Sequence, residues 1–426
     1  MTGFLQGNIL HIHILGICGT FMASLAGIAK EKGIKVTGQD KAYYPPMSNQ
    51  LQDLNIKENL TEDITDDLKN CDSVIIGNSL SRGDKSVEYV LKNNLSFFSG
   101  PEWIRNNILQ DKFVFVVAGT HGKTTTTAML IEILNGCGFN PSYLVGGILK
   151  NENKGYRYTD SDYFIIEGDE YDTSFFDKRS KFIHYKPNVL IINNIEYDHS
   201  DIFEDIEQIK KQFHFLIRSM PSNANIICNP KDINTKSLLE MGCWSNKINF
   251  YPIKNIKNII GDHNIQNAGA AAAAAKIIGV KEIQAADALE NFSGVKRRLE
   301  KKQHKNLIIY DDFAHHPTEI EASIKAIEEK HPEAKIVKII EIRSNSMING
   351  AHKNALIDIF KKTENLYIYC KKELNWLENT PYFDINIEID DLVKKINCNT
   401  ENVDIVILMS NGDTADVINK IINYGK

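Results

Sequence analysis

The segment 114–134 constrains the fold more than any other part of the chain. It opens with an apolar, β-branched run at 114–117, which predicts a buried strand. Two glycines, Gly119 and Gly122, break this run, and a helical pattern begins at Lys123. A strand, a glycine-rich turn and a helix N-terminus form an anion site, because backbone N–H groups point at the ligand and the helix dipole favours its charge. The segment therefore predicts a parallel α/β sheet with a phosphate group bound at its edge.

The residue types in this turn indicate ATP. Lys123 is placed to reach the β- and γ-phosphates, and the Thr124 hydroxyl to bind the magnesium ion that they carry. The usual pattern has glycine where this chain has Val117, so the match rests on Gly-Thr-x-Gly-Lys-Thr. The alternative is a tight strand–helix turn with a solvated lysine. We expect ATP to contact Gly119, Thr120, His121, Gly122, Lys123, Thr124 and Thr125.

Length and composition set the class of protein. The 426 residues are enough for about three domains of ~150 residues. A net charge of −6 without a basic, aromatic-rich stripe argues against a nucleic-acid partner. The seven cysteines are scattered and form no CxxC pair, no apolar run approaches the ~18 residues of a membrane span, and the N-terminus lacks a signal-peptide pattern. We expect a soluble cytoplasmic protein without a membrane partner, and the sequence leaves its oligomeric state open.

Residues 1–105 are predicted to form a first α/β unit. A strand at 9–15, a glycine-containing turn and a helix at 20–32 resemble the opening of a nucleotide-binding βαβ unit. Ile14 occupies the place of the first glycine of the dinucleotide fingerprint, which disfavours an NAD-dependent oxidoreductase. Asp40 follows the second strand, where it is either a ribose-binding acid or a turn residue.

The middle segment, 106–299, predicts a metal site beside the phosphate loop. Strands at 163–166 and 189–192 lead to Glu167 and His199, and parallel strands bring their carboxyl ends to one edge. Magnesium prefers oxygen ligands, so Glu167 fits it better than His199 does.

Polar side chains further along this segment have two interpretations each. Asn264 and Asn267 share a face of a predicted helix start, where they read an adenine edge or cap the helix. Arg297 and Arg298 are either surface charges or a clamp for a transferring phosphoryl group.

The last segment, 300–426, predicts a third α/β unit. Its first long strand leads to Asp312 and to the pair His315-His316. Two adjacent histidines suggest a metal, but no cysteine or third ligand is spaced to complete such a site. We therefore expect a polar contact to phosphate or ribose from this pair.

Six motifs occur in the order and spacing typical of one enzyme family. They are GTHGKTTTT at 119–127, EGDEYDT at 167–173, NIEYDH at 194–199, DHNIQN at 262–267, GVKRRLE at 294–300 and YDDFAHHP at 310–317. By these motifs the chain resembles the Mur ligase family, and the resemblance extends from about residue 11 to residue 412. The flanking segments HIHILGICGTFMASLA, VTGQDKAYYPPMSNQL, IGNSLSRGD and RSNSM are similar to members that attach a recycled peptide to UDP-N-acetylmuramate.

The resemblance implies three α/β domains and a reaction. A Rossmann-like UDP-binding domain at 1–105 would precede a P-loop-type ATPase domain at 106–299 and a Rossmann-like domain at 300–426 that contacts the amine substrate. ATP would phosphorylate the lactyl carboxylate of UDP-N-acetylmuramate, and the amine of L-alanyl-γ-D-glutamyl-meso-diaminopimelate would then displace phosphate. Two rivals remain: a UDP-N-acetylmuramate–L-alanine ligase with the same mechanism, and an ATP-binding switch without ligase activity.

The resemblance also implies residue roles. Lys123, Glu167, His199 and Arg298 would be catalytic, with magnesium held by Thr124, Glu167 and His199. Asn264, Asn267, Arg298 (or its neighbour Arg297), Asp312 and His315 would contact the nucleotide. The substrates would contact Gly16, Cys18, Gly19, Thr20, Asp40, Asn78, Ser79, Ser81, Arg82, His214, Arg343, Ser344 and Asn345. His214 stands where several Mur ligases have a carbamylated lysine, so it either replaces that group or is an ordinary histidine on a helix face.

Overall fold

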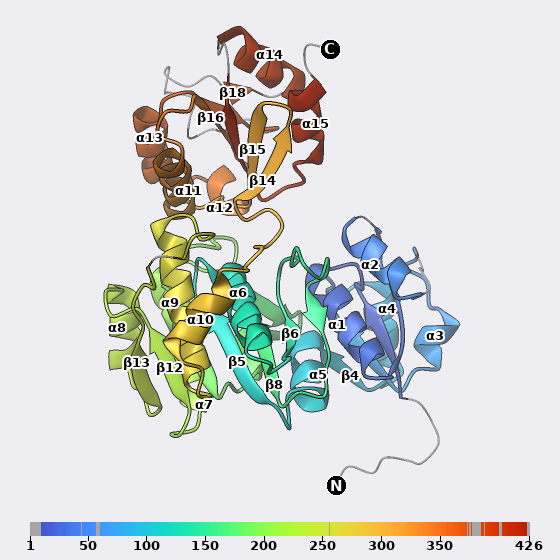
Figure 1. Ribbon diagram of the computed structural model, residues 1–426. Coiled ribbons are helices and arrows are strands. Elements are labelled where there is room, and N and C mark those ends of the chain that lie inside the picture. Colours follow the sequence, from blue (N-terminus) through green and yellow to red (C-terminus); the bar gives the residue numbers. More distant parts are fainter. Residues whose placement is uncertain are drawn as a thin grey trace.

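The computed structural model describes residues 10–43, 45–56, 60–254, 256–372, 374, 376, 385–386, 388–399 and 403–423. Three open sheets follow one another along the chain, each flanked by helices, which confirms the predicted three-part α/β fold (Figure 1). In the view of Figure 1 the first two units lie side by side, and the third stands above the second. None of the helices in the described part of the chain has the length and apolar character needed to span a bilayer.

The first sheet is parallel, with strand order β2-β1-β3-β4. Its strands are β1 (His11–Leu15), β2 (Lys35–Gln39), β3 (Ser73–Ile76) and β4 (Phe97–Ser99). Its helices are α1 (Thr20–Glu31), α2 (Met47–Asp53), α3 (Asp66–Lys69), α4 (Lys85–Lys92) and α5 (Gly100–Asn107). The loop between β1 and α1 and the loop after β3 both leave the carboxyl ends of strands, where open sheets bind ligands.

The central sheet has the order β13-β12-β11-β5-β8-β6-β7 and is parallel except for the β6–β7 pair. Its strands are β5 (Phe113–Ala118), β6 (Ser142–Leu144), β7 (Tyr156–Arg157), β8 (Tyr163–Glu167), β11 (Val189–Ile192), β12 (Asn225–Cys228) and β13 (Asn246–Asn249). The hairpin β9 (Asp172–Ser174) and β10 (Asp177–Ser180) and the 3-10 helix η1 (Lys181–His184) lie between β8 and β11 in sequence. The helices are α6 (Lys123–Gly136), α7 (Ile206–Ser219), α8 (Ile233–Glu240), α9 (Asp262–Lys276) and α10 (Glu282–Leu289).

Strand β5 is buried on both faces, which explains its uninterrupted apolar run. Val114 and Val116 share a core with residues of α1 and α5, so the first unit packs on this face of the central sheet. Phe115 and Val117 face the opposite core, formed with α6 and with the alanine run of α9. The six alanines at 270–275 let α9 pack closely, as their sequence pattern predicts, and Ala270, Ala271, Ala274 and Ala275 have no exposed surface.

The third sheet has the order β14-β15-β19-β16-β17-β18 and is parallel except for the β14–β15 pair. Its strands are β14 (Glu300–His304), β15 (Leu307–Asp312), β16 (Ile336–Glu341), β17 (Leu366–Tyr369), β18 (Ile385–Asn386) and β19 (Ile405–Met409). Its helices are α11 (Pro317–Lys330), α12 (Asn345–Ile348), α13 (Lys353–Lys362), α14 (Ile389–Asn399) and α15 (Ala415–Asn423).

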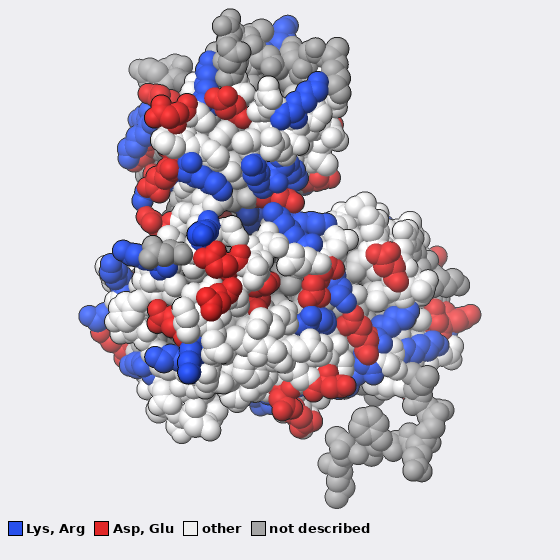
Figure 2. Space-filling view, in the orientation of Figure 1, with Lys and Arg blue, Asp and Glu red and all other residues white. Residues whose placement is uncertain are grey.

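The second and third units meet at the carboxyl ends of their strands. The outline of the molecule narrows at this junction, and Lys and Arg side chains border it on the face shown in Figure 2. The segment 196–201, which follows β11, makes several of the contacts. Thr318 donates a hydrogen bond to Glu196 at 2.6 Å, and Ser346 donates one to Asp198 at 3.1 Å. Loops from both sheets therefore border the same space.

Candidate active site

The phosphate loop lies between β5 and α6, where the sequence predicts it. Gly119 and Gly122 have φ angles of 128° and 77°, a conformation that favours glycine. A Cβ atom at Gly122 would come within 2.4 Å of Oδ1 of Asn267. Val117, at the position usually occupied by glycine, lies inside β5 opposite Glu167. The strand thus continues through this position, and the turn begins only at Gly119.

The ammonium group of Lys123 is held over the loop. Its Nζ donates to the carbonyl oxygens of Gly119 at 2.7 Å and Thr120 at 3.1 Å, and to Glu170 at 2.8 Å. Burial alone would lower the pKa of Lys123, but the nearby carboxylates, first Glu170 and then Glu167, outweigh it and raise this pKa. Lys123 is therefore a cation at neutral pH, placed where phosphate oxygens would accept hydrogen bonds from it.

Glu167 lies at the end of β8, directly beside the loop. Its Oε1 accepts a hydrogen bond from the Thr124 hydroxyl at 2.9 Å, and its Oε2 accepts one from the Gly146 amide at 2.7 Å. Burial raises the pKa of Glu167 despite these donors. A hydroxyl and a partly buried carboxylate that lacks full charge compensation are a donor set that fits Mg²⁺.

His199 follows β11 and has a positive φ of 56°. Its Nδ1 lies 3.0 Å from the Tyr171 hydroxyl, and its Nε2 lies 3.0 Å from Oε1 of Glu170. Burial lowers the pKa of His199, but Glu170 and Asp198 outweigh burial and raise it. Both ring nitrogens thus have partners, and a metal bound by His199 would replace one of them.

Glu170 is the residue of this site that the sequence interpretation missed. It is 3% exposed, and its carboxylate contacts both Lys123 and His199. It belongs to the EGDEYDT motif, but position in a motif does not show which of several acids points inward. Only the structure identifies Glu170, because it shows the contacts of this carboxylate with Lys123 and His199.

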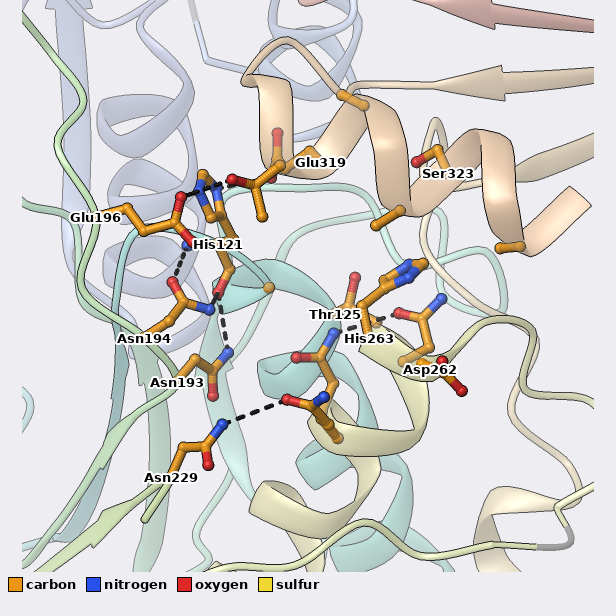
Figure 3. Close-up of a pocket in the computed structure, with 18 of the residues that line it drawn as sticks. His121, Thr125, Asn193, Asn194, Glu196, Asn229, Asp262, His263, Glu319 and Ser323 are labelled. Carbon is orange, nitrogen blue, oxygen red and sulfur yellow. Dashed lines mark hydrogen bonds and ion pairs between the residues drawn. The ribbon is translucent and has the colours of Figure 1, made fainter. Parts of the chain in front are cut away.

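Two large cavities meet at the phosphate loop. One, of about 470 Å³, is lined by predicted catalytic residues, namely Lys123, Thr124, Glu167, His199 and Arg298. The other, of about 610 Å³, lies on the opposite side of the loop between α9 and α11 (Figure 3). His121, Gly122 and Arg298 line both cavities, so the loop forms the wall between them.

The larger cavity collects the predicted nucleotide contacts Asn264, Asn267 and Asp312 together with Thr125. Asn264 donates to the carbonyl oxygen of Ile260 at 2.8 Å, and Asn267 donates to Oδ1 of Asn264 at 3.3 Å. Asp312 is buried and accepts hydrogen bonds from the amides of Leu299 and Phe313 at 3.2 and 2.9 Å. Burial raises its pKa. These side chains line the cavity while also bonding to the protein.

The structure distinguishes the two adjacent arginines. Cζ of Arg298 lies 5.0 Å from the centroid of the Phe313 ring, and its Nη1 lies 3.7 Å from Oε1 of Glu319. Arg298 lines both cavities. Arg297 donates instead to the Ser410 carbonyl at 2.6 Å and lies 3.4 Å from Asp311. Arg298 is therefore the arginine that faces the phosphate loop.

The N-terminal loops approach the smaller cavity through Gly19, Thr20 and Asn78. Asp40 accepts a hydrogen bond from the Cys18 amide at 2.8 Å and so fixes the loop after β1.

The other predicted substrate contacts of the first unit fall into two groups. One group lies where the loops after β1 and β3 meet, and the other is bonded toward the start of α4. A Cβ atom at Gly16 would lie 3.5 Å from the Ser79 hydroxyl, which places the two loops side by side. Ser81 donates its amide to Asp84, and Arg82 pairs with Glu88 at 2.8 Å. Neither Ser81 nor Arg82 lines the two cavities, because both are bonded toward the start of α4.

The C-terminal unit borders a third cavity, of about 210 Å³, beside His199. Its lining includes the predicted substrate contacts Arg343, Ser344 and Asn345, and also His315. Asn345 donates to Asp201 at 3.2 Å.

The structure bears on two further expectations. His214 lies on α7 and lines none of these three cavities, and its ring centroid lies 6.4 Å from that of Trp244. This position favours the second alternative, an ordinary histidine on a helix face. His316, but not its neighbour His315, does have possible metal partners among the described residues. They come from remote segments, since nitrogen and oxygen atoms of His316, His121 and Glu196 lie within 4.8 Å of one another.

Comparisons with known proteins agree with this geometry. Residues 117–257 match the Mur ligase middle domain, and residues 11–112 match the model described as Mur ligase family, catalytic domain. The UDP-N-acetylmuramate–L-alanyl-γ-D-glutamyl-meso-2,6-diaminoheptandioate ligase of Haemophilus influenzae is 40% identical over 97% of this chain and 98% of its own. The crystal structure of a murein peptide ligase from Psychrobacter arcticus superposes with a TM-score of 0.73 at 34% identity, over 97% and 98% of the two chains. This chain belongs to the Mur ligase family.

Proposed function

We propose that this chain joins L-alanyl-γ-D-glutamyl-meso-diaminopimelate to UDP-N-acetylmuramate at the expense of ATP. The observation that carries the proposal is the similarity to the Haemophilus influenzae ligase of that name, 40% identical over nearly the full length of both chains. The Escherichia coli relative of the same name, 41% identical over 86% of each chain, supports the same assignment. The reaction would return a cell-wall tripeptide to a nucleotide-linked precursor.

In the first step a lactyl carboxylate oxygen attacks the γ-phosphorus of ATP, and ADP leaves. Two anions must approach each other, so positive charge has to be fixed before they meet. Lys123 and Arg298 are two cations beside the phosphate loop. Thr124, Glu167 and His199 would hold Mg²⁺, which supplies further positive charge to the phosphate oxygens when bound.

In the second step the alanyl amine attacks the acyl carbon, its nitrogen loses a proton to solvent, and inorganic phosphate leaves from the tetrahedral intermediate. The 470 Å³ cavity would hold the reacting groups, since it joins the N-terminal loops to the phosphate loop. The 610 Å³ cavity would hold the nucleoside of ATP beside Asn264, Asn267 and Asp312. The peptide would enter past Arg343, Ser344 and Asn345.

The nearest alternative is a ligase that accepts L-alanine alone. A UDP-N-acetylmuramate–L-alanine ligase from Christiangramia forsetii is 29% identical over 97% of this chain. Phosphate release in the presence of ATP, Mg²⁺ and UDP-N-acetylmuramate, measured with tripeptide or with L-alanine, separates the two. We expect the tripeptide to give the higher kcat/KM by at least tenfold, and faster turnover with L-alanine would overturn the proposal.

An ATP-binding switch without ligase activity is the alternative of another class. Such a protein would hydrolyse ATP at the same rate with and without UDP-N-acetylmuramate. We expect phosphate release to depend on both the UDP-sugar and the peptide, because the acyl phosphate forms on the former and is consumed by the latter.

A further inference from the structure

Three ionisable side chains from separate segments converge on the domain junction. His121 belongs to the phosphate loop, Glu196 follows β11, and His316 is the N-cap residue of α11. Nε2 of His121 lies 3.4 Å from Oε2 of Glu196, and Nδ1 of His316 lies 3.8 Å from the same oxygen. Their potential ligand atoms all lie within 4.8 Å of one another.

These separations fit one class of metal ion. Zn²⁺ takes tetrahedral sites with metal–ligand distances of roughly 2.0–2.1 Å, so two of its ligands lie about 3.3 Å apart. The distances of 3.4 and 3.8 Å are near that value. Two imidazole nitrogens and one carboxylate oxygen suit zinc, whereas magnesium selects oxygen ligands. A water molecule would complete the fourth position.

Each of the three side chains already has a partner that would orient it toward a metal. Nδ1 of His121 lies 3.5 Å from Oε1 of Glu319 (Figure 3). Nε2 of His316 lies 3.3 Å from the carbonyl oxygen of Tyr197. The Glu196 carboxylate accepts the hydroxyl of Thr318 at 2.6 Å. Outer partners of this kind fix the ring orientation of metal-ligating histidines in proteins.

One atom in the cluster lacks a hydrogen-bond partner. Nε2 of His121 is buried and makes no hydrogen bond, and the residue as a whole is only 8% exposed. Buried polar atoms are rarely left in this state without a functional reason. Carboxylate oxygens of Glu196 and Glu319 lie 3.4 and 3.5 Å from the two ring nitrogens of His121, and their negative charge favours a cation at this place.

We propose that His121, Glu196 and His316 bind a zinc-class divalent cation that fastens the phosphate loop to the first turn of α11. The site is separate from the magnesium ligands proposed above, since His199 is not one of its members. Binding costs the hydrogen bond that the Thr318 amide donates to Nδ1 of His316 at 3.3 Å. In exchange, the cation joins the central and C-terminal units through three strong bonds.

The test uses the full chain in millimolar Mg²⁺, so that oxygen-ligand sites are already filled. Co²⁺ is titrated as the spectroscopic probe, because four-coordinate Co²⁺ has a strong visible absorption, and Zn²⁺ is then added to displace it. We expect one tetrahedral Co²⁺ per chain in the wild type. His316→Gln and Glu196→Gln should each weaken binding by at least about 100-fold, since the loss of even an outer partner costs 10–100-fold.

Two control variants exclude other origins of the signal. His199→Ala removes a proposed magnesium ligand and should leave Co²⁺ affinity within threefold. His331→Gln removes a histidine that follows the other end of α11 and should also have no effect. Circular dichroism checks that each variant is folded, and the two ligand substitutions lie in different units, so a local folding defect in one unit does not explain the same loss in both. An absent tetrahedral spectrum, or a spectrum lost in His199→Ala but retained in His316→Gln, would overturn the proposal.

Discussion

Nζ of Lys123 lies 2.8 Å from the carboxylate of Glu170, and the same carboxylate lies 3.0 Å from Nε2 of His199. One buried acid therefore orients both the cation of the phosphate loop and a proposed metal ligand. The pKa of Glu170 is lowered, because Lys123 and His199 outweigh the effect of its burial. The group is thus an anion at neutral pH, and its charge favours the cationic form of Lys123.

Glu170→Gln should lower kcat by about 100-fold. The substitution keeps the size of the side chain but removes the charge that positions Lys123 and His199. Breaking one side of a buried ion pair also costs roughly 3 kcal/mol of stability. Steady-state phosphate release across a Mg²⁺ titration checks this, and half-saturation should shift to higher Mg²⁺. Asp172→Asn removes only an exposed pair with Lys178 and is the matched control. Equal rates in the two variants would contradict the assigned role.

Lys123→Ala should abolish turnover while leaving binding of UDP-N-acetylmuramate within about twofold. The lysine contacts the phosphate loop, whereas the proposed UDP contacts lie on the loops of the first sheet. Calorimetric titration with the UDP-sugar and single-turnover assays with ATP measure the two properties separately. Comparable loss of both would show that the proposed division of the sites is wrong.

The two adjacent arginines should have different effects. Arg298→Ala should reduce kcat about 100-fold, the usual cost of removing one donor to a developing charge. Arg297→Ala should mainly lower the thermal unfolding temperature, because Arg297 pairs with Asp311, which is fully buried in the C-terminal unit. Rate and melting curves of both variants test the distinction. If Arg297→Ala had the larger kinetic effect, the assignment of Arg298 to the phosphates would fail.

Acid stability should depend on His13. Burial lowers the pKa of His13 to about 4, below the ordinary value of 6.5, and its ring lies 2.8 Å from the Thr37 hydroxyl. Between pH 6.5 and 4 the unfolded chain therefore takes up a proton that the folded chain does not. The free energy of unfolding should fall as the pH falls through this window, by up to about 3 kcal/mol from this group. Melting curves of wild type and His13→Gln should converge toward pH 4; parallel curves would exclude this contribution.

The sequence was sufficient for the features that are local. Strand β5, the turn at Gly119 and helix α6 occur where periodicity and glycine positions predict them. The carboxyl-end positions of Glu167 and His199 also follow from strand order alone. The hairpin β9–β10 was not predicted, since its short polar strands lack an apolar alternation.

Features that depend on how distant segments pack together could not be predicted from the sequence. His214 could not be oriented because a helix presents several faces, and only the fold shows that this one carries Trp244 as a neighbour. Glu170 and the partners of His316 required knowledge of which distant loops meet. Other acids and histidines at similar spacings in the sequence would have been equally plausible as site residues.

Isotope transfer tests the central claim most directly. UDP-N-acetylmuramate labelled with ¹⁸O in its lactyl carboxylate is incubated with ATP, Mg²⁺, tripeptide and the full chain, and the phosphate released is analysed by mass spectrometry. If ATP activates that carboxylate, each phosphate formed carries one ¹⁸O atom, and the UDP-sugar product carries the tripeptide. Unlabelled phosphate released alongside ligated product, or ATP turnover without ligation, would contradict the proposed function.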